Sequence, residues 1–240
     1  MRKILLVNDD GYSSDALLAL EKELAPYGEV YVVAPKGARS GSGMALTIVN
    51  HVEIEKRHEH LYIVDATPAD CVSFALTSLP IKFDLTVSGI NYGHNLTYDV
   101  MHSGTCGACA ESLFYGVPAI AFSGEKNVVP SAKLVSQALD YIFNHDLLSL
   151  DYFLNVNFPI DVDNAKGIKF TKLDFRNDSR WFEYDEKSNI ATPKRIIGNK
   201  CGIGDGDVET VKDGYISITP LMKSFFSIDL YERIKKDKNL

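Results

Sequence analysis

The sequence predicts an α/β protein with a Rossmann-like, mostly parallel sheet, helices on both faces, and a β-rich C-terminal extension used in oligomerisation. In residues 1–165, short apolar runs alternate with segments of helical spacing, which is the rhythm of β-α-β units. Over 166–220 the pattern changes to polar, strand-like pieces with aromatic residues and glycine-rich breaks, which indicates an extension leaving this catalytic core. The last segment, 221–240, is amphipathic over 228–236 and is expected to form a helix that packs back on the core.

The expected strands of the core are short apolar or β-branched runs bounded by glycine and polar residues. The first, residues 4–7, ends in Asn8-Asp9-Asp10-Gly11, as a buried parallel strand does where it enters a loop. The others are expected at 30–34, 45–54, 61–64, 84–87 and 117–122, with a charged turn at 56–60.

The expected helices begin at residues that can cap them. Ser13 or Ser14 can cap the first, which carries leucines at helical spacing. Thr67-Pro68-Ala69-Asp70 opens the second with an N-cap threonine, a proline at the first helical position and an acidic residue in the first turn. Two more helices are expected at 105–115 and 132–143.

Composition excludes several classes of protein. The 240 residues are 45% hydrophobic and 24% charged, the balance of a soluble globular protein. No apolar run approaches the roughly 20 residues that cross a bilayer, so no membrane association is expected. The net charge of −7 disfavours binding to nucleic acid polymers. The four cysteines are too few for a disulfide framework and no export signal is recognised, which together favour a cytoplasmic location.

Three polar clusters follow expected strands: Asn8-Asp9-Asp10-Gly11, Arg39-Ser40-Gly41-Ser42-Gly43, and residues 88–95. In parallel α/β sheets, ligands bind outside the carboxyl ends of the strands. The three clusters are therefore expected to meet at one edge of the sheet and to form the functional site.

The adjacent carboxylates of Asp9 and Asp10 are expected to hold a metal ion. Two neighbouring carboxylates repel each other, and a divalent cation removes that repulsion. The Ser40 hydroxyl and the Asn91 carboxamide complete an all-oxygen set, which favours one Mg²⁺ or Mn²⁺ ion over structural zinc. The alternative, that Asp-Asp-Gly is only a turn that caps the next helix, has about equal weight for so short a motif.

A second candidate site lies at Ser103-Gly104-Thr105, just before a helix of small residues. The unpaired N–H groups and the dipole of a first helical turn favour phosphate, and Ser103 and Thr105 add hydroxyl groups. An ordinary N-cap packed against the sheet explains the same residues about as well.

Other motifs carry less weight. Cys106 and Cys109 have redox-motif spacing, but a redox role is expected at only about one chance in ten because the surrounding pattern is missing. His94 and His102 flank the proposed site and either could assist proton transfer. The dinucleotide and P-loop fingerprints do not occur.

Taken together, these stretches resemble the stationary-phase survival protein SurE family of metal-dependent 5′-nucleotidases. The matching residues lie in order and cover most of the chain, at 4–11, 33–41, 67–72, 88–95, 99, 103–105 and 214–220. Each motif is weak alone, but the combination is highly specific.

The resemblance implies roles for individual residues. It makes the metal ligands Asp9, Asp10, Ser40 and Asn91, with Asp9, Asp10 and Asn91 as the catalytic groups. It places Asn95, Ser103, Gly104 and Thr105 around the substrate phosphate. It also implies nucleoside 5′-monophosphates as substrates, with some tolerance for 3′-monophosphates and short polyphosphate. Ala66, Thr97 and Cys106 depart from the family pattern, which bears on substrate preference and rate.

The expected reaction is phosphomonoester hydrolysis by a metal-activated water, with Asp9 or Asp10 as base and covalent attack by Asp9 as a minority alternative. One rival is a signalling receiver domain, which would need a further aspartate and a lysine that are missing at suitable positions. The other is a nucleotide-binding module without catalysis.

The extension is expected to hold a homodimer or homotetramer together. Trp181, Phe182 and Tyr184 cluster within charged sequence that lacks the periodic apolar content for a core of its own. The resemblance implies the same, because family members associate through an exchanged C-terminal extension. A flap folded over the active site is the alternative, at about one chance in four.

Overall fold

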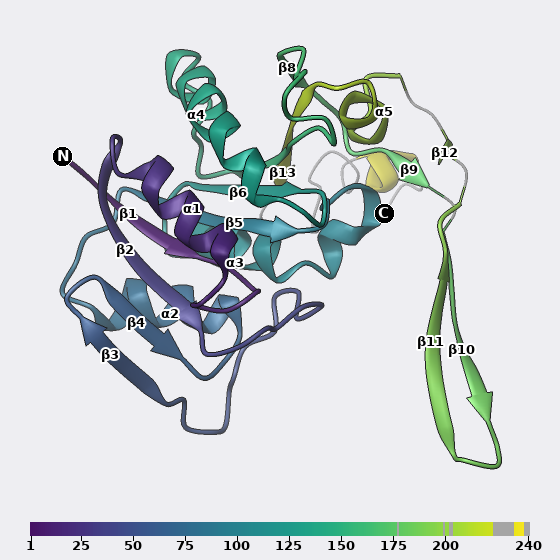
Figure 1. Ribbon diagram of the computed structural model, residues 1–240, viewed down its shortest axis with the longest axis horizontal. Helices are drawn as coiled ribbons and strands as arrows, with labels where there is room; N and C mark the ends of the chain where they lie inside the picture. The colour runs from purple at the N-terminus through teal and green to yellow at the C-terminus, as the bar shows by residue number, and fades with distance from the viewer. Residues whose placement is uncertain (177, 199, 202–203, 223–232, 238–240) are drawn as a thin grey trace.

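The computed structural model describes residues 1–176, 178–198, 200–201, 204–222 and 233–237. Its centre is a nine-stranded sheet (Figure 1). In chain order the strands of this sheet are β1 (Arg2–Val7), β2 (Gly28–Pro35), β3 (Ile54–His58), β4 (Leu61–Val64), β5 (Leu85–Tyr92), β6 (Ala119–Gly124), β7 (Tyr152–Asn157), β8 (Ile168–Phe170) and β13 (Ile216–Met222).

The sheet is mostly parallel, as the sequence predicts. Its order is β3-β4-β2-β1-β5-β6-β7-β13-β8, and the six strands from β4 to β7 pair in parallel. The remaining strands extend its two edges: β3 is antiparallel to β4, β13 is antiparallel to β7, and β8 is parallel to β13.

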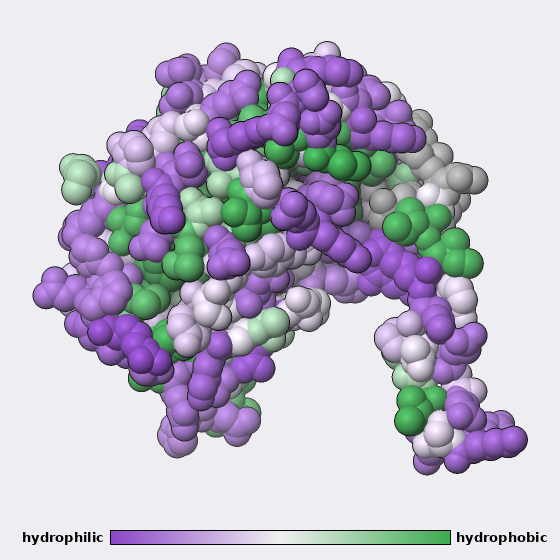
Figure 2. All heavy atoms as spheres, in the orientation of Figure 1, coloured by the Kyte–Doolittle hydropathy of each residue, from purple (hydrophilic) through white to green (hydrophobic). Residues whose placement is uncertain are grey.

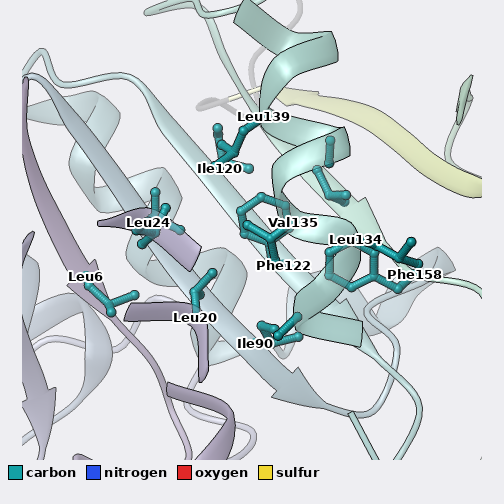
Figure 3. Close-up of a cluster of buried hydrophobic side chains, with 14 of the residues drawn as sticks. Leu6, Leu20, Leu24, Ile90, Ile120, Phe122, Leu134, Val135, Leu139 and Phe158 are labelled. Carbon is teal, nitrogen blue, oxygen red and sulfur yellow. The ribbon is translucent and has the colours of Figure 1, made fainter. Parts of the chain in front are cut away.

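Helices cover both faces of the sheet. They are α1 (Asp15–Leu24), α2 (Pro68–Ser78), α3 (Gly104–Phe114), α4 (Val135–Asn144) and α5 (Asp207–Lys212), with short 3₁₀ helices η1 (Thr97–Met101) and η2 (Val129–Leu134). Because side chains alternate along a strand, Leu6 of β1 packs with α1 and α4, whereas Leu5 packs with α2 and α3. Figure 3 shows the first of these layers, with Leu20 and Leu24 of α1 beside Leu6.

The start of α2 agrees with the sequence prediction in detail. The Thr67 hydroxyl accepts a hydrogen bond from the backbone N–H of Asp70 at 3.1 Å. The Asp70 carboxylate in turn accepts from the backbone N–H of Thr67 at 3.1 Å, so the two residues form a capping box.

The strand expected at 45–54 is wrong. The strand observed here is β3, at Ile54–His58, which overlaps the charged turn expected at 56–60, and all five of its residues are exposed. Residues 45–53 instead form a loop tied to α2, because Thr47 donates from its backbone N–H and its hydroxyl to the Asp70 carboxylate at 2.9 and 2.8 Å. An edge strand needs no apolar face, and its charged side chains oppose pairing with other chains.

The strand β7 was not among those expected from the sequence. Asn155 and Asn157 interrupt its apolar run, yet both side chains are fully buried. Their side chains form hydrogen bonds to the backbone of Asn95 at the functional site.

The C-terminal part divides differently from the expected extension. The strands β8 and β13 lie in the main sheet, so residues 216–220 are not part of an arm. What projects from the body is a hairpin of β10 (Ser179–Asp185) and β11 (Ile190–Ile196) (Figures 1 and 2). A two-stranded ribbon of β9 (Phe175–Arg176) and β12 (Lys200–Cys201) lies at its base.

The helix expected at 228–236 falls largely outside the described residues. Residues 233–237, which are described, are helical and exposed. In the described part of the chain, no helix is long and apolar enough to cross a membrane.

Candidate functional site

The site lies at the topological switch point of the sheet, where successive strands stop being added on one side of β1 and begin to be added on the other. From β1 the chain moves to β2 and β4 on one side, and it later returns to place β5 on the other side of β1. Ligands bind at such a switch point, outside the carboxyl ends of the strands. The ends of β1 and β5 carry Asn8-Asp9-Asp10 and Asn91, respectively.

A cavity of about 230 Å³ opens at this point. Five of the sequence-predicted site residues line it: Asp9, Ser40, Asn91, Asn95 and Ser103. The other three lie directly behind the cavity wall. Asp10 accepts a hydrogen bond from the N–H of Tyr92, a lining residue, while Gly104 and Thr105 pack against Asp9.

Asn8 shapes the turn that presents the two carboxylates. Its side chain donates to the Gly11 carbonyl at 2.9 Å and accepts from the Gly11 N–H at 3.2 Å. The next polar cluster is fastened to the same turn, because the Arg39 N–H donates to the Asp9 carbonyl at 2.7 Å. This contact brings the exposed Ser40 to the cavity.

Asp9 is almost fully buried, and burial raises the pKa of its carboxyl group. The Thr105 hydroxyl donates to Asp9 Oδ1 at 2.7 Å, which partly offsets that rise. Because this hydroxyl is committed to Asp9, Thr105 supports the carboxylate, and only its backbone remains available to a phosphate.

The pKa of Asp10 is raised to about 6, first by burial and then by the neighbouring charge of Asp9. The Tyr92 N–H, 3.4 Å from Asp10 Oδ2, lowers the pKa by a smaller amount. Two desolvated carboxylates side by side are costly in their charged form, and a divalent cation relieves that cost. The donor chemistry of the site therefore fits such an ion.

Asn91 completes the oxygen set. Its Nδ2 donates to the Gly93 carbonyl at 2.7 Å, so the amide plane is fixed and Oδ1 is available as an acceptor. The pairing of β5 with β6 is irregular between Ser88 and Asn91. Irregularities of this kind redirect side chains at the ends of strands, next to active sites.

Asn95 is held by side chains that sequence reasoning missed. Its Nδ2 donates to Ser123 Oγ at 2.8 Å, and its N–H donates to Asn157 Oδ1 at 2.9 Å. The Asn155 amide donates to the Asn95 carbonyl at 2.8 Å. The signal for these residues was present in the sequence, since two asparagines on one face of a buried strand require partners.

The start of α3 is closely packed against the carboxylate turn. The Ser103 hydroxyl accepts from the Cys106 N–H at 3.1 Å, so Ser103 is the N-cap that the alternative interpretation expected. A Cβ at Gly104 would lie 2.6 Å from Ser42 Oγ and 2.9 Å from Asp9 Cβ. Only glycine lets the first helical turn approach Asp9 this closely.

Burial distinguishes the remaining candidates, which are two histidines for proton transfer and two cysteines for redox chemistry. His94 is bonded through Nε2 to the Phe158 carbonyl at 2.7 Å, and burial lowers its pKa, whereas His102 is exposed at the cavity. Cys106 and Cys109 are buried free thiols, and burial raises the pKa of Cys106 to about 12. A redox role requires an accessible thiolate, so these thiols do not suit one.

Two charged residues outside the sequence-predicted set also line the cavity: Asp99 of η1 and Arg195 of β11. Arg195 Nη2 donates to Asp99 Oδ2 at 2.7 Å. No local pattern marks Arg195, because it reaches the cavity only through the placement of the hairpin.

Comparisons with known proteins agree with one another. The family model described as "Survival protein SurE" matches residues 4–180. The chain is similar to the 5′-nucleotidase SurE of Campylobacter lari, at 33% identity over 98% of both chains. It is also similar to that of Ehrlichia ruminantium (strain Welgevonden), at 36% identity over 95% of this chain and 96% of the relative. The crystal structure of the SurE protein from Aquifex aeolicus superposes with a TM-score of 0.84, at 32% identity, covering 98% of this chain and 99% of that one.

Proposed function

The chain belongs to the SurE family, and from this membership we propose that it is a divalent-metal-dependent phosphatase that hydrolyses nucleoside 5′-monophosphates to nucleoside and inorganic phosphate. The relatives named 5′-nucleotidase support the substrate class. The observation that carries the proposal is the Asp9–Asp10 pair, whose pKa values are raised by burial at the switch point of the sheet.

In this proposal Asp9, Asp10, Ser40 and Asn91 hold one Mg²⁺ or Mn²⁺ ion. Their oxygen atoms are the ligands these ions prefer, and burial of the carboxylates supports the assignment. A divalent ion bound there supplies positive charge to a phosphoryl oxygen and lowers the pKa of water.

The protein groups then orient the reactants and move a proton. Asp9 or Asp10 accepts the proton of the attacking water. Asn91 contributes its side-chain oxygen, which the bond from Nδ2 to Gly93 holds in place, as a ligand of the ion. Asn95 and the backbone N–H groups at the start of α3, around Ser103 and Gly104, stabilise negative charge that develops on the phosphoryl oxygens. Direct attack by Asp9 on phosphorus is the less favoured alternative.

The decisive experiment measures release of inorganic phosphate from purified protein. AMP and other nucleoside 5′-monophosphates should be hydrolysed with Mg²⁺ or Mn²⁺, not with EDTA, and activity should return when the ion is restored. The same screen includes 3′-monophosphates and short polyphosphate, for which we propose weaker activity. Binding of AMP without release of phosphate would favour the non-catalytic module instead.

Substitutions of the carboxylates locate this activity at the site. Asp9→Asn and Asp10→Asn should each lower kcat by about 10²-fold or more, the order expected for lost electrostatic stabilisation. The control is Asp15→Asn, an exposed aspartate at the start of α1. Turnover close to wild type in a folded Asp9 or Asp10 variant would leave only the capping-turn interpretation.

We also propose that the protein is a homodimer or homotetramer and that the β10–β11 hairpin forms part of the contact. Every residue of both strands is exposed, including Phe182 at 67% and Ile190 at 60%. An isolated two-stranded hairpin is marginally stable in water, so a second copy of the chain supports this proposal as the partner of its apolar side chains. The alternative of a flap is less favoured, since the base of the hairpin borders the cavity while its tip extends away (Figure 1).

A further inference from the structure

The cavity is poor in positive charge. Among the described residues that line it, Arg195 is the sole lysine or arginine, whereas Asp9 and Asp99 are both acidic. Asp10 adds another carboxylate next to Asp9, and in the proposed function a divalent ion offsets the charge of these two groups. A phosphate monoester is negatively charged, so a cationic side chain at this cavity contributes to its binding by electrostatic attraction.

Arg195 is held at the cavity by two carboxylates. Its Nη2 donates to Asp99 Oδ2 at 2.7 Å and also to Asp178, and its Nε donates to Asp178 Oδ2 at 3.2 Å. These contacts fix the plane of the guanidinium group. Because the side chain is already ordered, ligand binding loses less conformational entropy.

The other end of the same guanidinium group is open. Nη1 carries two further N–H groups, and it donates to no described group. The side chain is 34% exposed. A fixed guanidinium nitrogen with unused N–H groups at the edge of a cavity suits an oxyanion, because charge-assisted N–H···O bonds from arginine to phosphate are short and strong.

We propose that Arg195 binds the phosphate group of the substrate, so that the hairpin contributes a residue to the substrate site. Asp99 and Asp178 act as positioning residues that present the guanidinium group. The identity of the substrate rests on the proposed function, whereas the charge and donor geometry apply to any phosphate monoester.

A matched pair of arginines tests this role. Arg180 of β10 donates to Asp99 Oδ1, the other oxygen of the same carboxylate, and it is not among the residues that line the cavity. Arg195→Ala and Arg180→Ala therefore each remove one link between the hairpin and η1, but only the first removes a cavity cation. Arg195→Lys keeps the charge and loses the planar fork.

For Arg195→Ala, the KM for AMP and the inhibition constant of inorganic phosphate should both rise about 10- to 100-fold, as expected for lost hydrogen bonds to a charged group. The kcat value should change much less, since ground state and transition state both carry the phosphate. Arg195→Lys should recover part of the loss, and Arg180→Ala should keep both constants near wild type. Circular dichroism and thermal melting would show whether each variant is folded.

Two results would overturn the inference: unchanged constants in Arg195→Ala, or equal changes in Arg180→Ala, which would make Arg195 a clamp for the hairpin only. If the wild-type protein failed to hydrolyse AMP, the proposed function would fall separately. Calorimetric titration with inorganic phosphate in the presence of Mg²⁺ would then decide, because equal affinities of wild type and Arg195→Ala would also overturn the inference.

Discussion

At the scale of single residues, Asp9 and Asp10 are adjacent in the chain but are held in different ways. Asp9 is almost fully buried and accepts a hydrogen bond from Thr105. Asp10 is partly exposed and receives only a long contact from the Tyr92 N–H. The Thr105 hydroxyl thus favours the charged form of Asp9, whereas the charge of Asp9 disfavours that of Asp10.

This difference makes Thr105 a test of metal binding. In Thr105→Val the shape is kept and the donor to Asp9 is lost, so the pKa of Asp9 should rise further and the charged ligand becomes harder to form. We expect the free Mn²⁺ concentration for half-maximal activity to increase about 10- to 100-fold, as for other partners of metal ligands. Thr105→Ser should stay near wild type, and Cys109→Ser should have little effect. An unchanged metal requirement in Thr105→Val would show that the bond is dispensable.

The stability of the metal-free protein should depend on the charge of Asp10. Its pKa is about 6 in the fold against 3.8 for an ordinary aspartate, so the fold prefers the protonated form. This preference is fully present below pH 3.8 and is lost as the pH rises through 6. Asp10→Asn, which stays neutral, should therefore melt higher than wild type at pH 8 in EDTA.

Solvent screening of this partly exposed group reduces the effect to about 1 kcal/mol, which corresponds to a rise of roughly 2–4 °C in Tm. The difference should vanish below about pH 3, where Asp10 is protonated in the folded and unfolded states. Equal melting temperatures at both pH values would contradict the raised pKa.

At the scale of elements, η1 contains a strained position. Thr97 has φ of 54°, in the left-handed region that glycine favours and a β-branched side chain resists. Its N–H donates to the buried carboxylate of Asp207 at 3.1 Å, which holds the start of η1 against α5. The positive φ makes threonine unusual at this position of η1, the same element that supplies Asp99 to the cavity.

Replacing this residue should relieve the strain. Thr97→Gly removes a left-handed penalty of about 1–2 kcal/mol, which exceeds the roughly 0.5–1 kcal/mol of chain entropy that glycine costs. We expect Tm to rise by roughly 2 °C. Asn189→Gly is the control, because Asn189 has φ of 59° but asparagine tolerates this region, so no rise is expected. A fall in Tm for Thr97→Gly would mean that packing of the buried threonine side chain outweighs its strain.

At the scale of the whole molecule, the hairpin connects two proposed properties. Its exposed apolar side chains favour contact with a second copy, and its base carries Arg195 to the cavity. Assembly would then stabilise the element that completes the substrate site.

Light scattering tests the assembly. Residues 179 and 196 are paired across the base of the hairpin, so a short Gly-Ser linker can replace residues 179–196 without moving the flanking chain. We expect this variant, and Phe182→Ser with Tyr184→Ser, to have a lower molar mass than wild type. Glu183→Gln, on the same strand, is the control. A monomeric wild-type protein at micromolar concentration would refute the oligomer, and an excised variant of unchanged mass would refute the role of the hairpin.

The sequence by itself determined five parallel strands of the core, β1, β2, β4, β5 and β6, and the position of the candidate site at their carboxyl ends. Two apolar runs end in polar residues, one in Asn8-Asp9-Asp10 and the other in the segment that contains Asn91. Local pattern predicts these strands, and the rule that parallel strands bring their carboxyl ends to one edge of the sheet predicts that the polar residues meet. The N-cap at Thr67 was likewise predicted, because a cap acts on residues of its own first turn.

Only the tertiary structure decided which groups support those residues. Thr105 meets Asp9, and Arg195 meets Asp99, each across 96 positions of the chain. The strand β3 depends in the same way on its neighbour β4, because its own residues are polar and exposed. Local propensity and periodicity act over a few residues, whereas these contacts exist only once distant segments have packed.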